Sequence, residues 1–250
     1  MLMKAITVLT PENISAPLPS GFTPAYMLYR VMADGRLYRA EASFLPSGGI
    51  MGVSFESGAC SPSLASEITA EAKARGFSAL LFDAPQENPV SVCETAALCS
   101  ASLPVYAPAF ISEKLPNAFV LTETALFSGT LKARLEDAVG RFGRERVVAD
   151  VERLRMEFSP PASDERGRIL TGAELSALFS RRTSGPHYSP DLAAWYFNYR
   201  DGEQTRFVLY DDLQSLRRKT ALISSLGIGS AVFSYREVSD VIGRLFGQPS

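Results

Sequence analysis

Short apolar runs alternate with amphipathic stretches through most of the chain, and this alternation restricts the fold more than any other feature. The apolar runs read "GGIMGVSF", "FSALLFD", "LPVYAPAF", "NAFVLTET", "RVVADV" and "SAVFSY". Each has the length and composition of a strand that is buried on both faces. Segments of about 10–15 residues with helical periodicity separate several of them. The pattern therefore predicts β-α-β units and a parallel sheet.

The helical segments carry residues that are typical of helix ends. Ser61, followed by a proline, predicts a helix start, and Gly76 predicts the end of the same helix. An apolar stripe over residues 131–142 predicts a second helix, which Gly143 terminates. Thr171 and Glu174 have the spacing of a capping box at the start of a further helix. These signals place helices between the predicted strands.

Two segments predict antiparallel hairpins instead. The first turns at Ala33-Asp34-Gly35, between two aromatic runs. The second is an aromatic hairpin near residues 192–210, with a turn at Asp201-Gly202. Asp211 or Asp212 is then expected to cap the next helix.

We interpret the whole pattern as an α/β fold, specifically a trimmed (β/α)8 TIM barrel with an N-terminal β segment. About eight strands are predicted, and 250 residues are enough for one such barrel. An open doubly wound sheet is the second choice, weakened because no glycine-rich nucleotide motif follows an early strand. We expect one domain over residues 1–250, in which residues 1–24 are a strand and a connector. A polar loop is expected over residues 158–168.

Composition excludes several functions. The 25 basic and 27 acidic residues give a net charge of −2, which argues against nucleic-acid partners. No apolar run is long enough for a membrane helix, so we expect no membrane insertion. His187 is the single histidine, and Cys60, Cys93 and Cys99 lack zinc-site spacing. We therefore expect no metal, no cofactor and a reducing compartment.

The last quarter of the chain has three distinctive groups of residues. The aromatic hairpin ends in Tyr-Asp-Asp at residues 210–212, the next helix contains Ser-Leu-x-x-Lys at residues 215–219, and Leu-Gly-Ile-Gly occupies residues 226–229. In this order they resemble family 18 glycoside hydrolase barrels, especially the bacterial branch linked to spore cortex and cell-wall glycans. The resemblance spans about residues 25–246, and it implies the fold more strongly than the activity.

The family's catalytic signature is Asp-x-x-Asp-x-Asp-x-Glu, at the end of what we count as the third strand. The resemblance places its four acidic positions on Ser78, Leu81, Asp83 and Pro85. It implies that the third aspartate orients the substrate acetamide, which attacks the anomeric carbon, and that the glutamate is the general acid. A proline has no proton to donate, and loss of a general acid lowers rates by roughly 10²–10⁴-fold. Ser234 likewise replaces the tryptophan of the family's last strand, so we expect no family-type hydrolysis.

Ligand-binding candidates come from the predicted carboxyl ends of strands, where TIM barrels have their sites. Asp83 is the strongest candidate, and a cap of the following turn is its alternative role. We also select Glu56, Glu123, Tyr106 and Tyr235. We assign no catalytic residue.

Other polar residues near strand ends carry less weight. Asp150, Glu152 and Glu237 are noted there but not selected. Glu87 is expected in a rigid loop between two prolines. Trp195, Phe197 and Tyr199 share one face of the hairpin, and we expect them to cover the edge of the barrel rather than to stack on sugar rings.

The sequence leads to three hypotheses about function. The first is an inactive family 18-like protein that binds a glycan containing N-acetylglucosamine, such as peptidoglycan or a chitin-like polymer. The second is a structural or assembly protein, for example of a spore, without a ligand. The third is an active glycosidase that uses relocated carboxylates. We expect a cytoplasmic or spore-associated protein, because the N-terminus is a poor signal peptide; the oligomeric state stays open.

Overall fold

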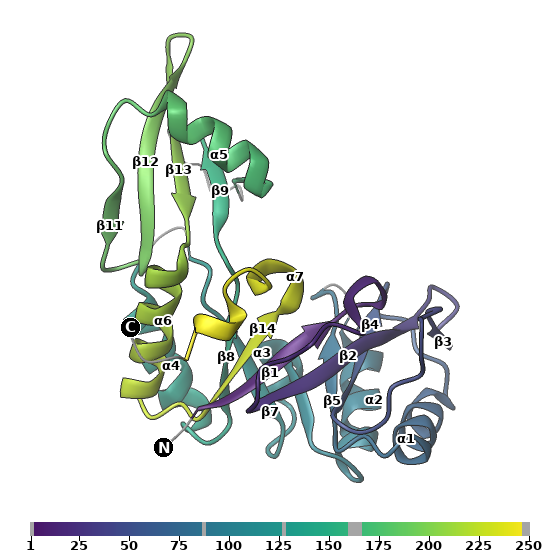
Figure 1. Ribbon diagram of the computed structural model, residues 1–250. Coiled ribbons are helices and arrows are strands. Elements are labelled where there is room, and N and C mark those ends of the chain that lie inside the picture. Colours follow the sequence, from purple (N-terminus) through teal and green to yellow (C-terminus); the bar gives the residue numbers. More distant parts are fainter. Residues whose placement is uncertain (1–2, 87–88, 127–128, 160–166, 247–250) are drawn as a thin grey trace.

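The protein is a closed parallel barrel from which a smaller antiparallel sheet projects (Figure 1). The structure, a computed structural model, describes residues 3–86, 89–126, 129–159 and 167–246. Glu87 and most of the predicted polar loop over 158–168 lie outside these residues.

Eight parallel strands form the barrel. β1 pairs with β14 on one side and with β2 on the other, so the sheet closes on itself. This closure confirms the predicted barrel and shows that the alternative of an open sheet is wrong. In chain order the strands are Lys4–Leu9 (β1), Phe22–Val31 (β2), Ile50–Phe55 (β4), Ala79–Asp83 (β5), Val105–Pro108 (β6), Phe119–Glu123 (β7), Val147–Val151 (β8) and Ser230–Ser234 (β14).

The N-terminal segment supplies a barrel strand. The barrel strands begin β1, β2, β4 and β5, so β5 is the fourth barrel strand. Our prediction that Asp83 ends the third strand is therefore wrong, and it ends the fourth. The predicted first hairpin is present: β3 (Leu37–Arg39) pairs antiparallel with β2. Gly35 turns it with a φ of +76°, which glycine adopts without strain.

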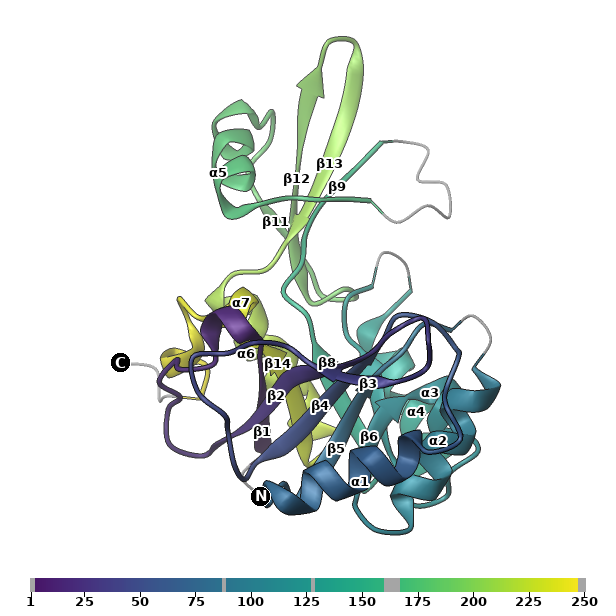
Figure 2. The ribbon, with the colours of Figure 1, turned by 90° about the vertical axis from the view of Figure 1, so that its right-hand side faces the viewer.

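Helices pack against the outside of the barrel, where the outward side chains of the strands are apolar. Leu64, Ile68 and Ala72 of the first helix pack with Val53 and Phe82 of two strands. The helices are Leu64–Ala74 (α1), Val90–Ser100 (α2), Ala109–Ser112 (α3), Leu131–Phe142 (α4), Leu213–Ser225 (α6) and Tyr235–Val238 (α7), with 3-10 turns at Pro11–Asn13 (η1) and Ile242–Arg244 (η2). Figure 2 shows α1 and α2 along one side of the barrel.

The barrel is trimmed as expected. The 3-10 turn η1 connects β1 to β2, and the hairpin with β3 connects β2 to β4, so neither connection has an α-helix in the described residues. The connection from β6 to β7 has only the four-residue α3.

The second sheet is inserted between β8 and α6. Its strand order is β10-β9-β13-β12-β11, and all of its pairings are antiparallel. The predicted aromatic hairpin forms its centre. Its elements are Arg155–Phe158 (β9), Arg168–Ile169 (β10), Gly172–Arg181 (α5), His187–Ser189 (β11), Ala194–Asp201 (β12) and Gln204–Tyr210 (β13).

The hairpin aromatics form the core of this second sheet. Phe197 and Tyr199 are buried, and they pack with Phe179 and Leu178 of α5. The indole nitrogen of Trp195 donates a hydrogen bond to Asp212. They therefore pack within the inserted sheet, and not over the edge of the barrel.

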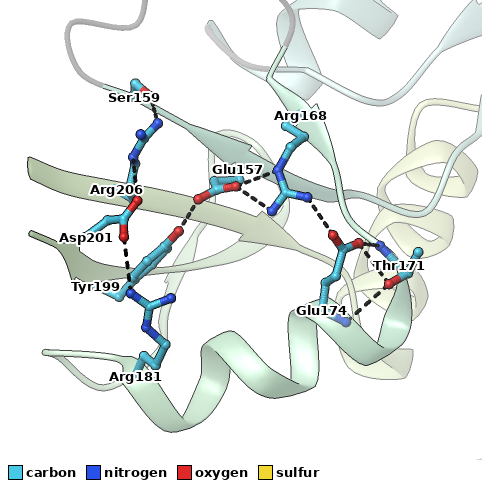
Figure 3. A network of polar contacts seen from close by, with 9 residues as sticks. All are labelled: Glu157, Ser159, Arg168, Thr171, Glu174, Arg181, Tyr199, Asp201 and Arg206. Carbon is cyan, nitrogen blue, oxygen red and sulfur yellow. Dashed lines mark hydrogen bonds and ion pairs between the residues drawn. The ribbon is translucent and has the colours of Figure 1, made fainter.

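Polar groups brace the same sheet around Glu157 (Figure 3). Its carboxylate accepts a hydrogen bond from the Tyr199 hydroxyl and forms an ion pair with Arg168, whose Nη2 lies 2.7 Å away. Arg168 also contacts Glu174, which completes the predicted capping box with Thr171. Burial, strengthened by the hydrogen bond to Glu157, raises the pKa of Tyr199 to about 12, so this hydroxyl stays a donor.

A fully buried ion pair lies where the inserted sheet returns to the barrel. The Nζ atom of Lys219 is 2.5 Å from Oδ2 of Asp211, and neither side chain is exposed. The same oxygen accepts the backbone N–H of Leu154, and Oδ1 accepts the Ser215 hydroxyl. The neighbouring Asp212 caps α6, as one of our two alternatives predicted.

We predict that Lys219→Met destabilises the protein by about 3–5 kcal/mol, because it leaves the Asp211 carboxylate buried without its counter-ion. Urea unfolding at neutral pH measures the loss. The matched control is Lys132→Met, which removes an exposed ion pair with Glu136 and is expected to cost less than about 0.5 kcal/mol. Equal effects of the two substitutions would show that the buried pair contributes no more than a surface pair.

Candidate functional site

Strand alternation decides which side chains point into the barrel. One inward set is apolar and fills the interior: Ile6, Ala25, Ile50, Ala79, Leu81, Tyr106, Val148 and Val232. Towards the amino ends of the strands, the ring of Tyr106 stacks on Phe119 with centroids 4.6 Å apart. Its hydroxyl accepts a hydrogen bond from Lys4 at 3.2 Å. Side chains therefore fill this end of the barrel.

Two residues further along their strands, the inward positions become polar. Leu81 is followed by Asp83, Leu121 by Glu123 and Val148 by Asp150. These carboxyl groups line a cavity of about 890 Å³ at the carboxyl ends of the strands. The cavity is open at the barrel end where TIM-barrel enzymes have their active sites.

The cavity is strongly acidic. Six carboxylic side chains line it, belonging to Asp83, Glu113, Glu123, Asp150, Glu152 and Glu237. In the described part of the chain, Arg134 is the one basic residue among the lining residues, and its guanidinium is 3.9 Å from Glu123. Glu113 is paired with Arg141. Two of the six acids are thus paired with arginines, and acidic side chains still outnumber basic ones among the described residues that line the cavity.

Asp83 and Asp150 differ from the other acids of the cavity. Within the described residues, no hydrogen bond or ion pair reaches either carboxyl group. Burial raises the pKa of Asp83. Burial, together with the charges of Glu152, Glu123 and Glu237, raises the pKa of Asp150 to about 8. At neutral pH Asp150 is therefore mostly a neutral acid that can donate a proton or a hydrogen bond.

The segment after β8 is fixed from several sides. The backbone N–H of Arg153 donates to Glu237 at 2.9 Å, and the Arg153 guanidinium contacts Asp240 and the Asp211 carbonyl. With the bond from Leu154 to Asp211, these contacts hold the chain that carries Glu152 at the rim.

A smaller pocket of about 170 Å³ continues the site towards the inserted sheet. It shares Glu123, Glu152 and Glu237 with the main cavity. Its other walls include Arg155 of β9 and Ile169 of β10. The inserted sheet therefore extends the site along one side.

The structure separates the residues that we selected from the sequence. Asp83 and Glu123 line the cavity. Glu56 does not line it and pairs with Arg30 at 3.4 Å on the surface. Tyr106 lies at the closed end of the barrel. Tyr235, the first residue of α7, is partly buried and packs against an apolar cluster. Ligand binding by these residues stays a prediction.

Sequence reasoning passed over Asp150, together with Glu152 and Glu237. Asp150 follows the inward-pointing Val148 by two residues, so strand alternation places it on the inner face of β8. The sequence alone does not show which face of β8 points inward, so it could not predict this position.

The described residues contain no group of three or more histidine, cysteine or acidic side chains placed to hold a metal ion. All three cysteines are free thiols. Among the described segments, no helix is long and apolar enough to cross a membrane.

No protein-family model and no curated protein matches this chain. Solved structures do match it. The spore cortex-lytic enzyme SleL of Bacillus cereus superposes with a TM-score of 0.66 at 16% identity, over 97% of this chain and 73% of SleL. A chitinase from Chromobacterium violaceum gives 0.60 at 13% identity, over 98% of this chain and 100% of that one.

A plant class V chitinase from Cycas revoluta, solved with (GlcNAc)3, gives a TM-score of 0.62 at 13% identity, over 96% of this chain and 98% of that one. A Cycas revoluta structure in the same set is described as a family 18 chitinase. At these identities the likeness establishes the fold. The chain has a barrel like that of family 18 glycoside hydrolases.

We predict that Asp150 makes stability fall as pH rises. Its pKa is about 8 when folded against an ordinary 3.8, so the folded state holds a proton that the unfolded state loses between these values. The stabilisation by the bound proton is complete below the lower value and disappears above the upper one. The stability of the wild type relative to Asp150→Asn should fall by up to about 1.4 kcal/mol per pH unit in this window.

Urea unfolding of both proteins between the two pKa values tests this. Asp137→Asn on the exposed face of α4 is the matched control and should leave the slope unchanged. Parallel pH profiles for the wild type and Asp150→Asn would mean that Asp150 titrates normally.

Proposed function

We propose that this family 18-like barrel binds a glycan that contains N-acetylglucosamine in the cavity at the carboxyl ends of its strands. The observation that carries the proposal is the open cavity of about 890 Å³ around Asp83. Its size is in the range of small-molecule and oligosaccharide sites. The fold likeness to a chitinase solved with (GlcNAc)3 supports the choice of ligand.

The same cavity argues against a purely structural role. A barrel that serves only as a scaffold has no need for an open, charged mouth, and buried carboxyl groups without partners cost stability. Asp150, which is mostly enclosed and has no partner among the described residues, is such a group, and the exposed Asp83 beside it adds to the acidic character of the mouth. Retaining them favours a site that receives a ligand.

We infer that the protein does not hydrolyse glycans by the family's route. Pro85 lines the cavity two residues after Asp83, at the position to which the resemblance assigns the general acid. Its side chain offers neither a proton nor a hydrogen-bond acceptor. Asp83 remains available to bind the acetamide of a bound sugar.

A second candidate function is hydrolysis by relocated carboxylates. The raised pKa of Asp150 favours it, because a general acid must be protonated near neutral pH. Asp83 or Glu123 would then be the partner carboxylate. A spore or cell-wall setting is the one we propose for either function, on the resemblance to that branch and on the fold likeness to SleL.

We predict that the full chain binds an N-acetylglucosamine trimer or a peptidoglycan fragment with micromolar to millimolar affinity, without releasing reducing sugar. Calorimetry measures the binding, and a reducing-end assay measures turnover. Asp83→Asn should weaken binding by about tenfold, because it removes a charge-assisted hydrogen bond.

Asp137→Asn, outside the barrel on α4, is the matched control and should bind like the wild type. Absence of binding to any of these glycans at millimolar concentration would refute the proposal. Turnover that Asp150→Asn abolishes would instead establish the second candidate.

A further inference from the structure

The charge of the cavity says more about its ligand than its shape does. N-acetylglucosamine units are neutral, whereas units that have lost the acetyl group carry an ammonium group. The cavity is lined by six carboxylic side chains and by Arg134 as the one basic residue among the described ones. Glu113 and Glu123 already have arginine partners, so the preference for charge rests on Asp83 and Asp150. An ammonium group can form ion pairs with these two carboxyl groups, and a neutral sugar cannot.

Asp150 is the second observation that points to a cation. Its carboxyl group is enclosed by protein except towards the cavity, and it has no partner among the described residues. The titratable groups that face it come from each surrounding element: Glu123 of β7, Asp83 of β5, Glu152 after β8 and Glu237 of α7. All of them are acidic.

From this arrangement we propose that the cavity selects glucosamine units with a free amino group, within a partly deacetylated glycan. The ammonium group would lie between Asp150 and Asp83, with Glu123 beside it. This inference rests on the proposed function and narrows its ligand from an acetylated to a partly deacetylated polymer. The selectivity for an amino group concerns binding alone and does not depend on whether the glycan is hydrolysed.

Binding of an ammonium group has a consequence for the proton on Asp150. A nearby positive charge favours the ionised form of a carboxyl group. Asp150 is mostly protonated in the free protein near neutral pH, so the ligand should displace that proton. A neutral N-acetylglucosamine oligomer leaves it in place.

Calorimetry on the full chain with two trimers, one of glucosamine and one of N-acetylglucosamine, tests the proposal. At about pH 6.5, where a sugar amine is largely protonated, the glucosamine trimer should bind at least about tenfold more tightly. Repeating the titration in buffers of different ionisation enthalpy should show release of about one proton per glucosamine trimer. The preference should shrink as salt is added.

Three variants and one further ligand sharpen the result. Asp150→Asn should abolish proton release and reduce the preference, and Asp83→Asn should reduce the preference. Asp137→Asn, on the outer face of α4, should change neither. Putrescine, a diamine without a sugar ring, should bind at least about tenfold more weakly than the glucosamine trimer.

The outcomes separate this inference from the function on which it rests. Equal or tighter binding of the acetylated trimer overturns the inference and leaves glycan binding intact. Putrescine binding as tight as that of the glucosamine trimer overturns sugar recognition. Binding of neither trimer overturns both the inference and the proposed function.

Discussion

The buried ion pair between Lys219 and Asp211 joins the parts of this molecule. Asp211 directly follows β13 of the inserted sheet, and Lys219 belongs to α6. The Asp211 carboxylate also accepts the backbone N–H of Leu154 after β8. Two charges removed from water are tolerated only when hydrogen bonds complete their surroundings, and here each oxygen of Asp211 has a donor. The pair therefore fixes both crossings between barrel and inserted sheet, and with them the rim of the cavity.

The arrangement of charge at the rim works against stability. Carboxylates that face one cavity repel one another, and burial raises the pKa of Asp83 and Asp150 further. The closed barrel below the cavity, filled by apolar residues from every strand, supplies the stability that offsets this repulsion. Because apolar side chains fill the lower layers of the interior, the polar residues at the mouth are not required for packing the barrel.

The sequence predicted the barrel because alternating strand and helix patterns record local burial, which each segment carries by itself. Asp83 and Glu123 were found in the same way, as the last residues of recognisable strands. Closure of the sheet by β1 depends on pairings with β2 and β14, which are distant in sequence, so the role of the N-terminal segment could not be predicted. The inserted sheet was missed as a separate layer for the same reason.

Two site residues show what strand alternation leaves undecided. Tyr106 does point inward, but it is the second residue of β6 and so lies near the amino end, stacked on Phe119. The pKa of Asp150 is raised first by its burial in the folded barrel, and then by the charges of Glu152 and of acids from β7, β5 and α7 that converge on it in three dimensions. Direction follows from a period of two along one strand, whereas depth and electrostatic environment depend on neighbouring strands.

The aromatic side chains of the inserted sheet limit how the site can hold a polymer. Phe197 and Tyr199 form the sheet's own core under α5, so they are not free to stack on sugar rings. The pocket at the base of this sheet is instead walled by Arg155, Ile169 and the three glutamates that it shares with the main cavity. The glycan that we propose would therefore meet both charged groups and the apolar side chain of Ile169 along this side, without an aromatic ring from the core of the inserted sheet. Recognition should then depend on hydrogen bonds and charge more than on stacking, which makes ionic strength the variable to which binding is most sensitive.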